Sequence, residues 1–375
     1  MAAKKLYIIA GEASGDLHGS NLIKALFNAE PDLDIRAWGG DWMEQAGATI
    51  VKHYKDLAFM GFLEVVMNLR TILNNLKFCK KDIEDFNPDA IILIDYPGFN
   101  MRIAEWAHQK GIKVLYYISP QVWAWKKNRV FKIKNTVDQM YVILPFEKAF
   151  YAQYDVDVEF VGHPLLDEIE EYKKTAISLV DFKAKNNLPE KPIIALMPGS
   201  RKQEISQMLP KMLNVVSHFP DHQFVIGASI SIGDEFYDPF LNNDQVSLVR
   251  HQTYDLFNLS DAGLVTSGTA TLEAAIFGMP EVVCYRGSAI SIAIARRLIK
   301  IKFISLVNLI MDKEVVKELI QSDLNTKNLV NQLKLILNPV YTQKLDQNYN
   351  ELRQKLGGSG ASEKVANAML KTLGN

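Results

Sequence analysis

Short apolar runs alternate with helix-like amphipathic segments along most of the chain. The clearest runs are residues 6–10, 90–94, 114–118, 140–144, 193–197, 224–226, 264–265 and 282–285. Runs of this kind are typical of strands buried on both faces, and their alternation with helices predicts parallel sheets wrapped by helices. The pattern breaks near residues 168–192, where charged residues precede a fresh apolar strand. We therefore expect an α/β protein of two doubly wound, Rossmann-like domains, residues 1–172 and 173–355, which face a central cleft that holds the ligands.

The composition describes an ordinary, well-cored protein. Its 375 residues are 48% hydrophobic and 23% charged, and the formal net charge of −1 gives no support for nucleic-acid binding. The two cysteines, Cys79 and Cys284, lie far apart and outside any CxxC or Cys/His cluster, which argues against a disulfide framework and a thiolate zinc site. The first apolar run is too short for a signal peptide, so we expect a cytoplasmic protein.

A small, hydroxyl-rich turn follows the apolar run at 264–265. We expect Ser267, Gly268 and Thr269 to open a helix whose hydroxyl side chains cap it and whose unpaired N–H groups face an anion. Such a turn binds a diphosphate without a metal ion. Glu273, about one and a half turns further on, can accept hydrogen bonds from a ribose. An ordinary strand–turn–helix junction remains the alternative.

Two more turns follow apolar strands in the same way. After residues 193–197 come Gly199, Ser200 and Arg201, where the backbone can approach a phosphate closely and the guanidinium can clamp it. After the first strand comes the glycine-rich segment 11–16, which can also cradle a phosphate. It has neither the GxGxxG spacing of a dinucleotide site nor the GKS or GKT of a P-loop, which argues against NAD or ATP chemistry. Both turns have a purely structural alternative.

Asp95 ends the fully apolar strand 90–94 and precedes a Tyr-Pro-Gly turn. A carboxylate at the carboxyl end of a parallel strand points toward the ligand cleft. Partial desolvation by the strand, Tyr96 and Phe99 would raise its basicity, which suits it to take a proton from an attacking hydroxyl. The alternative is an Asp that hydrogen-bonds only within its own turn.

Another cluster of candidate binding residues, 119–129, combines Trp123 and Trp125 with several cations after the strand 114–118. Indole rings stack on sugars and cations meet oxyanions, so this cluster indicates a carbohydrate or phosphate surface. Single-stranded nucleic acid would use the same residue types, but the chain lacks the basic charge for it. A Trp that only fills the core remains the alternative for one of the two.

Taken in order, these segments resemble the lipid-A-disaccharide synthase family, bacterial glycosyltransferases of the GT-B fold. The matching segments are GEASGD (11–16), MGFLEV (60–65), IDYPGFN (94–100), SPQVWAW (119–125), LPFEK (144–148), VGHP (161–164), PGSR (198–201) and SGTATLE (267–273). Each is weak alone. The ordered set spans both halves of the chain and is specific.

The resemblance implies transfer of 2,3-diacylglucosamine from its UDP conjugate to the 6-hydroxyl of 2,3-diacylglucosamine 1-phosphate, a step of lipid A and lipopolysaccharide biosynthesis. The products are UDP and the β-1,6-linked lipid A disaccharide 1-phosphate, formed with inversion, which needs one base and no carboxylate nucleophile. By resemblance, Asp95 is that base. The UDP side comprises Gly199, Ser200, Arg201, Ser267, Gly268, Thr269, Glu273, Asn308 and Gln321, and the acceptor side comprises Glu12, Ser14 and Asp16. No metal or other cofactor is expected, since a metal-binding DxD is absent from the matching sites. The family commonly has Pro where Val307 stands, which leaves the geometry of that loop open.

Lipid substrates require contact with a bilayer, and two segments suit it. Residues 57–67 carry one charge and are too short to span a membrane, whereas 290–304 mix apolar side chains with four cations. Buried helices are the alternative for both. We expect a peripheral protein on anionic lipid at the cytoplasmic face of the inner membrane, and a homodimer is compatible with the sequence. By resemblance alone, the helical tail 356–375 packs back on the first domain.

Other functions remain open on the residues themselves. A UDP-sugar epimerase or a peptidoglycan-type glycosyltransferase of the same fold would use the same nucleotide turns. A non-catalytic nucleotide-sugar-binding protein would need only the second-half turns.

Overall fold

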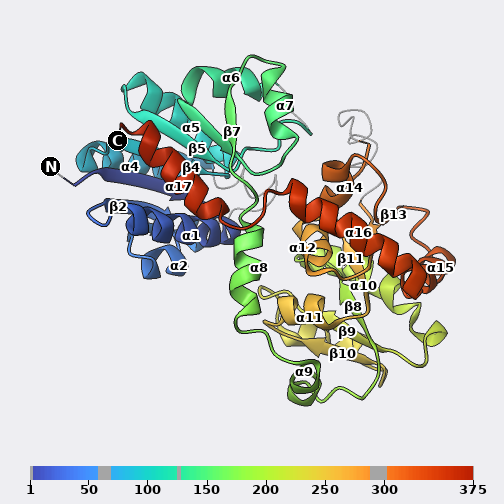
Figure 1. Cartoon of the computed structure of the whole chain (residues 1–375). Coiled ribbons are helices and arrows are strands. Elements are labelled where there is room, and N and C mark those ends of the chain that lie inside the picture. The colour runs from blue at the N-terminus through green and yellow to red at the C-terminus, as the bar shows by residue number, and fades with distance from the viewer. Residues whose placement is uncertain (1–2, 58–68, 125–127, 288–301, 375) are drawn as a thin grey trace. The chain divides into compact units, whose positions relative to one another are not determined.

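The computed structural model describes residues 3–57, 69–124, 128–287 and 302–374. The chain divides into two compact units, Met1–Asp167 with Leu356–Asn375, and Glu168–Lys355. Each unit is a parallel sheet covered by helices on both faces (Figure 1). The expected fold class, two Rossmann-like α/β domains, is confirmed. The division falls between Asp167 and Glu168, inside one helix, and not at the expected residue 172.

The first unit holds a seven-stranded sheet in the order β3-β2-β1-β4-β5-β6-β7, with every neighbouring pair parallel. Its strands are β1 (Lys5–Ala10), β2 (Asp34–Gly39), β3 (Thr49–His53), β4 (Ala90–Ile94), β5 (Lys113–Tyr117), β6 (Gln139–Val142) and β7 (Val158–Phe160). Its helices are α1 (Ala13–Ala29), α2 (Asp41–Gln45), η1 (Tyr54–Asp56), α4 (Leu69–Phe86), α5 (Pro97–Gln109), α6 (Arg129–Thr136), α7 (Glu147–Ala152) and α17 (Ala361–Thr372), and α8 (Leu165–Lys173) crosses the boundary.

The second unit holds a six-stranded parallel sheet in the order β10-β9-β8-β11-β12-β13. Its strands are β8 (Ile193–Met197), β9 (Gln223–Gly227), β10 (Val246–Val249), β11 (Ala262–Thr266), β12 (Glu281–Tyr285) and β13 (Lys317–Ile320). Its helices are α9 (Leu179–Lys185), α10 (Lys202–Leu213), η2 (Val216–His218), η3 (Asp234–Phe236), η4 (Asp238–Phe240), α11 (Thr253–Leu259), α12 (Thr269–Phe277), α14 (Leu306–Met311), α15 (Thr326–Ile336) and α16 (Pro339–Lys355).

Side-chain alternation along β1 explains the layered core of the first unit. Leu6 and Ile8 face one layer, which includes residues of α1 and α17, whereas Tyr7 and Ile9 face the other, which includes residues of α4 and α5. All four are fully buried. The strand after Lys5 therefore has to be apolar on both faces, which is why residues 6–10 form a continuous apolar run in the sequence.

The C-terminal helix α17 belongs to the first unit, where it packs against α1. Val365, Met369 and Leu370 are buried in the same core layer as β1. The Asp167 carboxylate accepts hydrogen bonds from the backbone N–H groups of Gly360 (2.5 Å) and Ser362 (2.9 Å). A carboxylate at this end of a helix satisfies N–H groups that have no partner within the helix.

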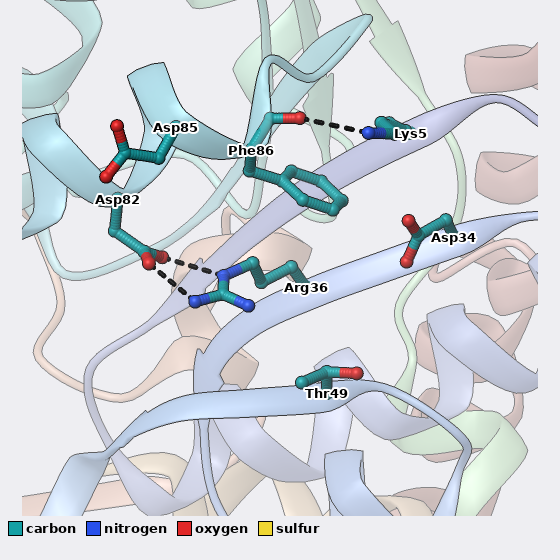
Figure 2. A pocket seen from close by; sticks show the side chains of 7 residues that line it. All are labelled: Lys5, Asp34, Arg36, Thr49, Asp82, Asp85 and Phe86. Atoms are coloured by element: carbon teal, nitrogen blue, oxygen red, sulfur yellow. Dashed lines mark hydrogen bonds and ion pairs between the residues drawn. The ribbon is translucent and has the colours of Figure 1, made fainter.

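At the amino ends of β1, β2 and β3 lies a hollow of about 380 Å³, and Figure 2 shows the side chains that line it. Its central contact is a bidentate ion pair in which Arg36 donates from Nε (2.9 Å) and Nη2 (2.6 Å) to Asp82. Tyr7 donates a further hydrogen bond to Asp82 (2.7 Å) and accepts one from Trp38 (2.8 Å). The hollow lies at the edge of the sheet opposite the carboxyl ends of these strands, and it is held by a largely buried polar network.

Cys79 and Cys284 are both buried and not disulfide-bonded. Within the described ranges, no helix is long and apolar enough to cross a membrane. The apolar segment 57–67 and the cationic segment 290–304 lie almost entirely outside the described residues.

We expect Asp82→Asn to destabilise the first unit by about 2–3 kcal/mol, because it leaves the half-buried Arg36 without its anionic partner. Urea unfolding followed by circular dichroism measures this. Asp85→Asn is the matched control, since Asp85 lines the same hollow but is exposed. Equal effects of the two substitutions would contradict the structural role of Asp82.

Glu281 at the start of β12 predicts a pH-dependent stability. The side chain is buried, and neither carboxyl oxygen has a hydrogen-bond partner among the described residues. Burial therefore raises its pKa well above the ordinary value of 4.5. The folded state holds a proton that the unfolded state has lost, so the free energy of unfolding falls as pH rises above about 4.5, by up to about 1.4 kcal/mol per pH unit.

Glu281→Gln removes this dependence, so its stability relative to the parent chain should increase between pH 5 and pH 8. Chemical unfolding across that range measures the difference. Glu235→Gln, which removes an exposed carboxylate in the same unit, controls for net charge. A difference between Glu281→Gln and the parent chain that stays constant with pH would contradict the account.

Candidate active site

The first turn of the first unit joins β1 to α1 and passes closely beside the ring of Tyr96. A Cβ atom added to Gly11 would lie 2.3 Å from the Tyr96 ring, so only glycine fits there. Glu12 occupies the N-cap position of α1, and both Glu12 and Ser14 are exposed. These two acceptor-side candidates are therefore free to meet a ligand at the carboxyl edge of the sheet.

Asp16, the third acceptor-side candidate, has a structural role. Its carboxylate is buried and accepts hydrogen bonds from the backbone N–H groups of Gly40 (2.7 Å), Met43 (3.1 Å) and Trp42 (3.2 Å). These groups form the start of α2, so Asp16 anchors α2 to α1. Its assignment to the acceptor side stays a prediction.

Asp95 lies directly after β4 in an unusual backbone conformation. Its φ angle is +43° and that of Tyr96 is +47°, so two consecutive residues with side chains occupy the left-handed region. Its N–H donates to the carbonyl of Tyr117 on the adjacent strand (3.2 Å). Such strain persists only where surrounding structure enforces it, and it is concentrated at functional sites.

The electrostatics of Asp95 favour a proton acceptor. Burial, followed by the negative charge of Glu12, raises the pKa of its carboxyl group to about 6, while the Tyr96 backbone N–H and His18 act in the opposite direction. At neutral pH the group remains ionised but is more basic than an exposed carboxylate. This combination suits a general base.

Glu147, which the sequence analysis did not single out, lies in a buried polar network near the same sheet edge. Burial raises the pKa of its carboxyl group to about 8, against the opposing effect of hydrogen bonds from the backbone N–H groups of Leu144 and Ile143. Ser119 bonds the hydroxyl of Tyr151 (2.6 Å). An acidic residue directly after the apolar Leu-Pro-Phe of the LPFEK segment was the available signal. The network fixes the start of the 119–124 turn, while Trp125 lies outside the described residues.

In the second unit, the turn after β8 carries Gly199, Ser200 and Arg201. Gly199 has a φ of +115°, and Arg201 is exposed at the N-cap of α10. Glu204 accepts hydrogen bonds from the Ser200 backbone N–H (3.2 Å) and from Arg201 (3.1 Å). A carboxylate thus engages the two donors that the sequence analysis assigned to a phosphate, which shows that they converge on one anionic group.

The turn after β11 leads into α12 without a side-chain cap. Gly268 is the N-cap residue, and Gly268 and Thr269 are exposed. The expectation that hydroxyl groups cap this helix is wrong, because Ser267 donates instead to the carbonyl of Ile304 (3.1 Å). Among the described residues, no side chain caps the N-terminal N–H groups of α12, as an anion site requires.

Glu273, the ribose candidate, is half-buried on α12. Burial raises the pKa of its carboxyl group to about 7, with the Glu168 carboxylate adding to the effect. Tyr254 donates to Glu168 (3.2 Å) and packs on Phe277 of α12 with ring centroids 5.2 Å apart. Glu273 thus lies close enough to Glu168 and Tyr254 to interact with them electrostatically, and its carboxyl group changes protonation near neutral pH.

Asn308 and Gln321 hold loops in place. Asn308 is fully buried, and its amide bonds both the backbone N–H of Val315 (2.7 Å) and the Glu318 carboxylate (2.9 Å). Glu318 also accepts from the N–H groups of Ile304 and Ser305, so the loop geometry left open at Val307 is held by this network. Gln321 has a φ of +56° and donates to the carbonyl of Gly287 (3.1 Å).

The structure brings together residues within each unit. In the first, Glu12 and Asp95 lie close enough to interact electrostatically, at the carboxyl ends of the paired strands β1 and β4. In the second, β8 pairs with β11, so the Arg201 and Gly268 turns follow adjacent strands. The side chains of Asn308 and Asp16 make hydrogen bonds within the fold, and their assignment to the ligand sites stays a prediction. Among the residues described, no group of three or more His, Cys, Asp or Glu side chains is arranged to hold a metal ion.

Known proteins resemble this chain over nearly its whole length. The family model for lipid-A-disaccharide synthetase matches residues 6–372. The lipid-A-disaccharide synthase of Syntrophus aciditrophicus is 40% identical over 98% of this chain and 97% of its own. That of Geobacter metallireducens is 38% identical over 99% of this chain and 98% of its own.

Solved structures share the fold. A UDP-GlcNAc 2-epimerase from Neisseria meningitidis bound to UDP-GlcNAc has a TM-score of 0.71 at 16% identity, covering 98% of this chain and 100% of its own. A glycotransferase of kitacinnamycin has a TM-score of 0.66 at 12% identity, covering 99% of each chain. The family match and the identities to full-length relatives decide the assignment, and the chain belongs to the lipid-A-disaccharide synthetase family.

Proposed function

We propose that the chain is an inverting glycosyltransferase that joins two acylated glucosamines into the lipid A disaccharide. The donor is UDP-2,3-diacylglucosamine and the acceptor is 2,3-diacylglucosamine 1-phosphate. The observation that carries this proposal is Asp95, an ionisable carboxylate of raised pKa on a strained turn at the carboxyl edge of the first sheet, in a member of this family.

The chemistry assigned to Asp95 is a single proton transfer. Its carboxylate takes the proton of the acceptor 6-hydroxyl while that oxygen bonds to the anomeric carbon of the donor. The bond from the anomeric carbon to the diphosphate breaks, and UDP leaves with the electron pair. One displacement inverts the anomeric centre and needs no covalent intermediate.

The departing diphosphate gains negative charge, which the second unit is suited to stabilise. Arg201 supplies a guanidinium, and the uncapped N-terminus of α12 at Gly268 and Thr269 supplies N–H groups and a positive dipole end. We assign ribose contacts to Glu273. Because these groups already supply positive charge at the leaving group, we propose transfer without a metal ion or other cofactor.

Peripheral contact with an anionic membrane is part of the proposal, because both substrates are lipids. On α4, Arg70, Leu73, Lys77 and Lys81 are exposed and recur at helical spacing on one face, and Phe78 is exposed beside them. Cations that flank apolar side chains suit the interface of an anionic bilayer. We place the enzyme at the cytoplasmic face of the inner membrane, as a monomer or a homodimer.

The reaction itself is the first test. Purified protein with both substrates in detergent micelles and EDTA should yield UDP and the disaccharide 1-phosphate by mass spectrometry. Asp95→Asn should lose turnover by about 10²- to 10⁴-fold while binding UDP as before. Conversion of the donor sugar alone would favour an epimerase, and UDP binding without any product would favour a binding protein.

Replacement of Glu12 tests the electrostatics of the base. The Glu12 charge raises the pKa of Asp95, so Glu12→Gln should lower that pKa and move the acid limb of the kcat/KM profile to lower pH. The sign follows because a base of lower pKa stays ionised in more acidic solution. Glu30→Gln is the control, because it removes a carboxylate at the C-cap of α1, the opposite end of the helix from Glu12. An acid limb that does not move, or that moves upward, would contradict this role.

A further inference from the structure

The backbone carbonyl of Asp95 is held by two buried side chains from separate elements. Tyr116 of β5 donates its hydroxyl to this oxygen at 2.6 Å, and Asn100 of α5 donates its amide at 2.8 Å. Both side chains are fully buried. Two short hydrogen bonds from buried donors to one carbonyl make that oxygen a fixed point at the sheet edge.

Asn100 also ties the neighbouring strands to this point. Its amide nitrogen lies 3.1 Å from the carbonyl of Ile94 at the end of β4 and 3.4 Å from that of Ile9 near the end of β1. Three converging carbonyls define which side of the amide faces them, because only the NH₂ group can donate. Asn100 therefore fastens the ends of two strands to the turn that carries Asp95.

The turn needs such support because of its conformation. Asp95 and Tyr96 both have positive φ, which side chains disfavour. Pro97 then begins α5, and its ring fixes its own φ and lacks an N–H group. With the carbonyl released, the turn can relax toward ordinary φ values, and the direction of the Asp95 carboxylate changes with it.

We propose that Tyr116 and Asn100 are positioning residues that clamp the Asp95 carbonyl and thereby aim its carboxylate at the acceptor hydroxyl. The inference rests on the proposed role of Asp95 as the base. It assigns these two residues no contact with substrate. They act on the reaction only through the geometry of one backbone turn.

Tyr116→Phe tests the clamp, because it removes one hydroxyl at nearly constant volume. We expect kcat to fall about 10- to 100-fold, because misplacement of a catalytic group lowers the rate by this order of magnitude. The affinity for UDP should not change. Loosening of the turn should also hydrate Asp95 and move the acid limb of the pH–rate profile to lower pH. Steady-state kinetics across pH and calorimetric UDP titration give these quantities.

Tyr141→Phe is the matched control. Tyr141 is also fully buried, lies on the next strand, β6, and bonds Thr372 through its hydroxyl at 2.9 Å. Removal of the Tyr141 hydroxyl should leave kcat and the acid limb of the pH–rate profile near the values of the parent chain. The clamp is overturned if Tyr116→Phe keeps kcat within about twofold of the parent, or if both variants lose kcat equally.

Asp95→Asn separates this inference from the proposed function. If Asp95→Asn keeps turnover, the base assignment fails, and the clamp has no catalytic purpose. If Asp95→Asn loses turnover while Tyr116→Phe keeps it, the base assignment stands and the clamp alone is wrong. Loss of turnover in both Asp95→Asn and Tyr116→Phe, while Tyr141→Phe stays active, supports both the base assignment and the clamp.

Discussion

The left-handed turn at the end of β4 is the constraint on which the candidate site of the first unit depends. The continuous apolar sequence of β4 buries the strand on both faces and fixes where it ends. The next residue, Asp95, then leaves the sheet in a conformation that exposes its carboxylate only partly. Glycine at position 11 leaves room for the Tyr96 ring, so the first and fourth strands determine this turn together. A carboxylate of raised pKa follows from that packing.

In the proposed function the second unit meets a different requirement, because the group assigned to it is the diphosphate anion of the donor. It presents exposed donors on turns after two adjacent strands, and it leaves the start of α12 without a side-chain cap. Glu204 engages Ser200 and Arg201 through its carboxylate, so an incoming phosphate has to compete with it or share those donors. The first unit thus shields a carboxylate from water, whereas the second keeps positive groups accessible.

The sequence predicted the elements whose residues all face a core, and it missed those whose environment is set by distant partners. Fully buried strands such as β1, β4 and β8 read as apolar runs, whereas β3, β7, β10 and β13 are edge strands with mixed side chains and gave no such signal. The fold class followed from these apolar runs, whereas the family followed from the ordered motifs, most of which lie in the turns after them. The internal hydrogen bonds of Asp16 and Asn308 could not be predicted, because the backbone groups that they bond become neighbours only in the folded chain. Glu147 was missed because its burial depends on a turn from another strand.

The central claim is that packing at the first sheet edge turns Asp95 into a base of raised pKa. Carboxyl ¹³C NMR of aspartate-labelled protein, titrated with pH and compared with Asp95→Asn, measures that pKa directly. The account predicts a resonance that is absent from Asp95→Asn and titrates near pH 6. A resonance of Asp95 that titrates at or below the ordinary value of 3.8 would contradict the account, because it would show a solvated or ion-paired carboxylate.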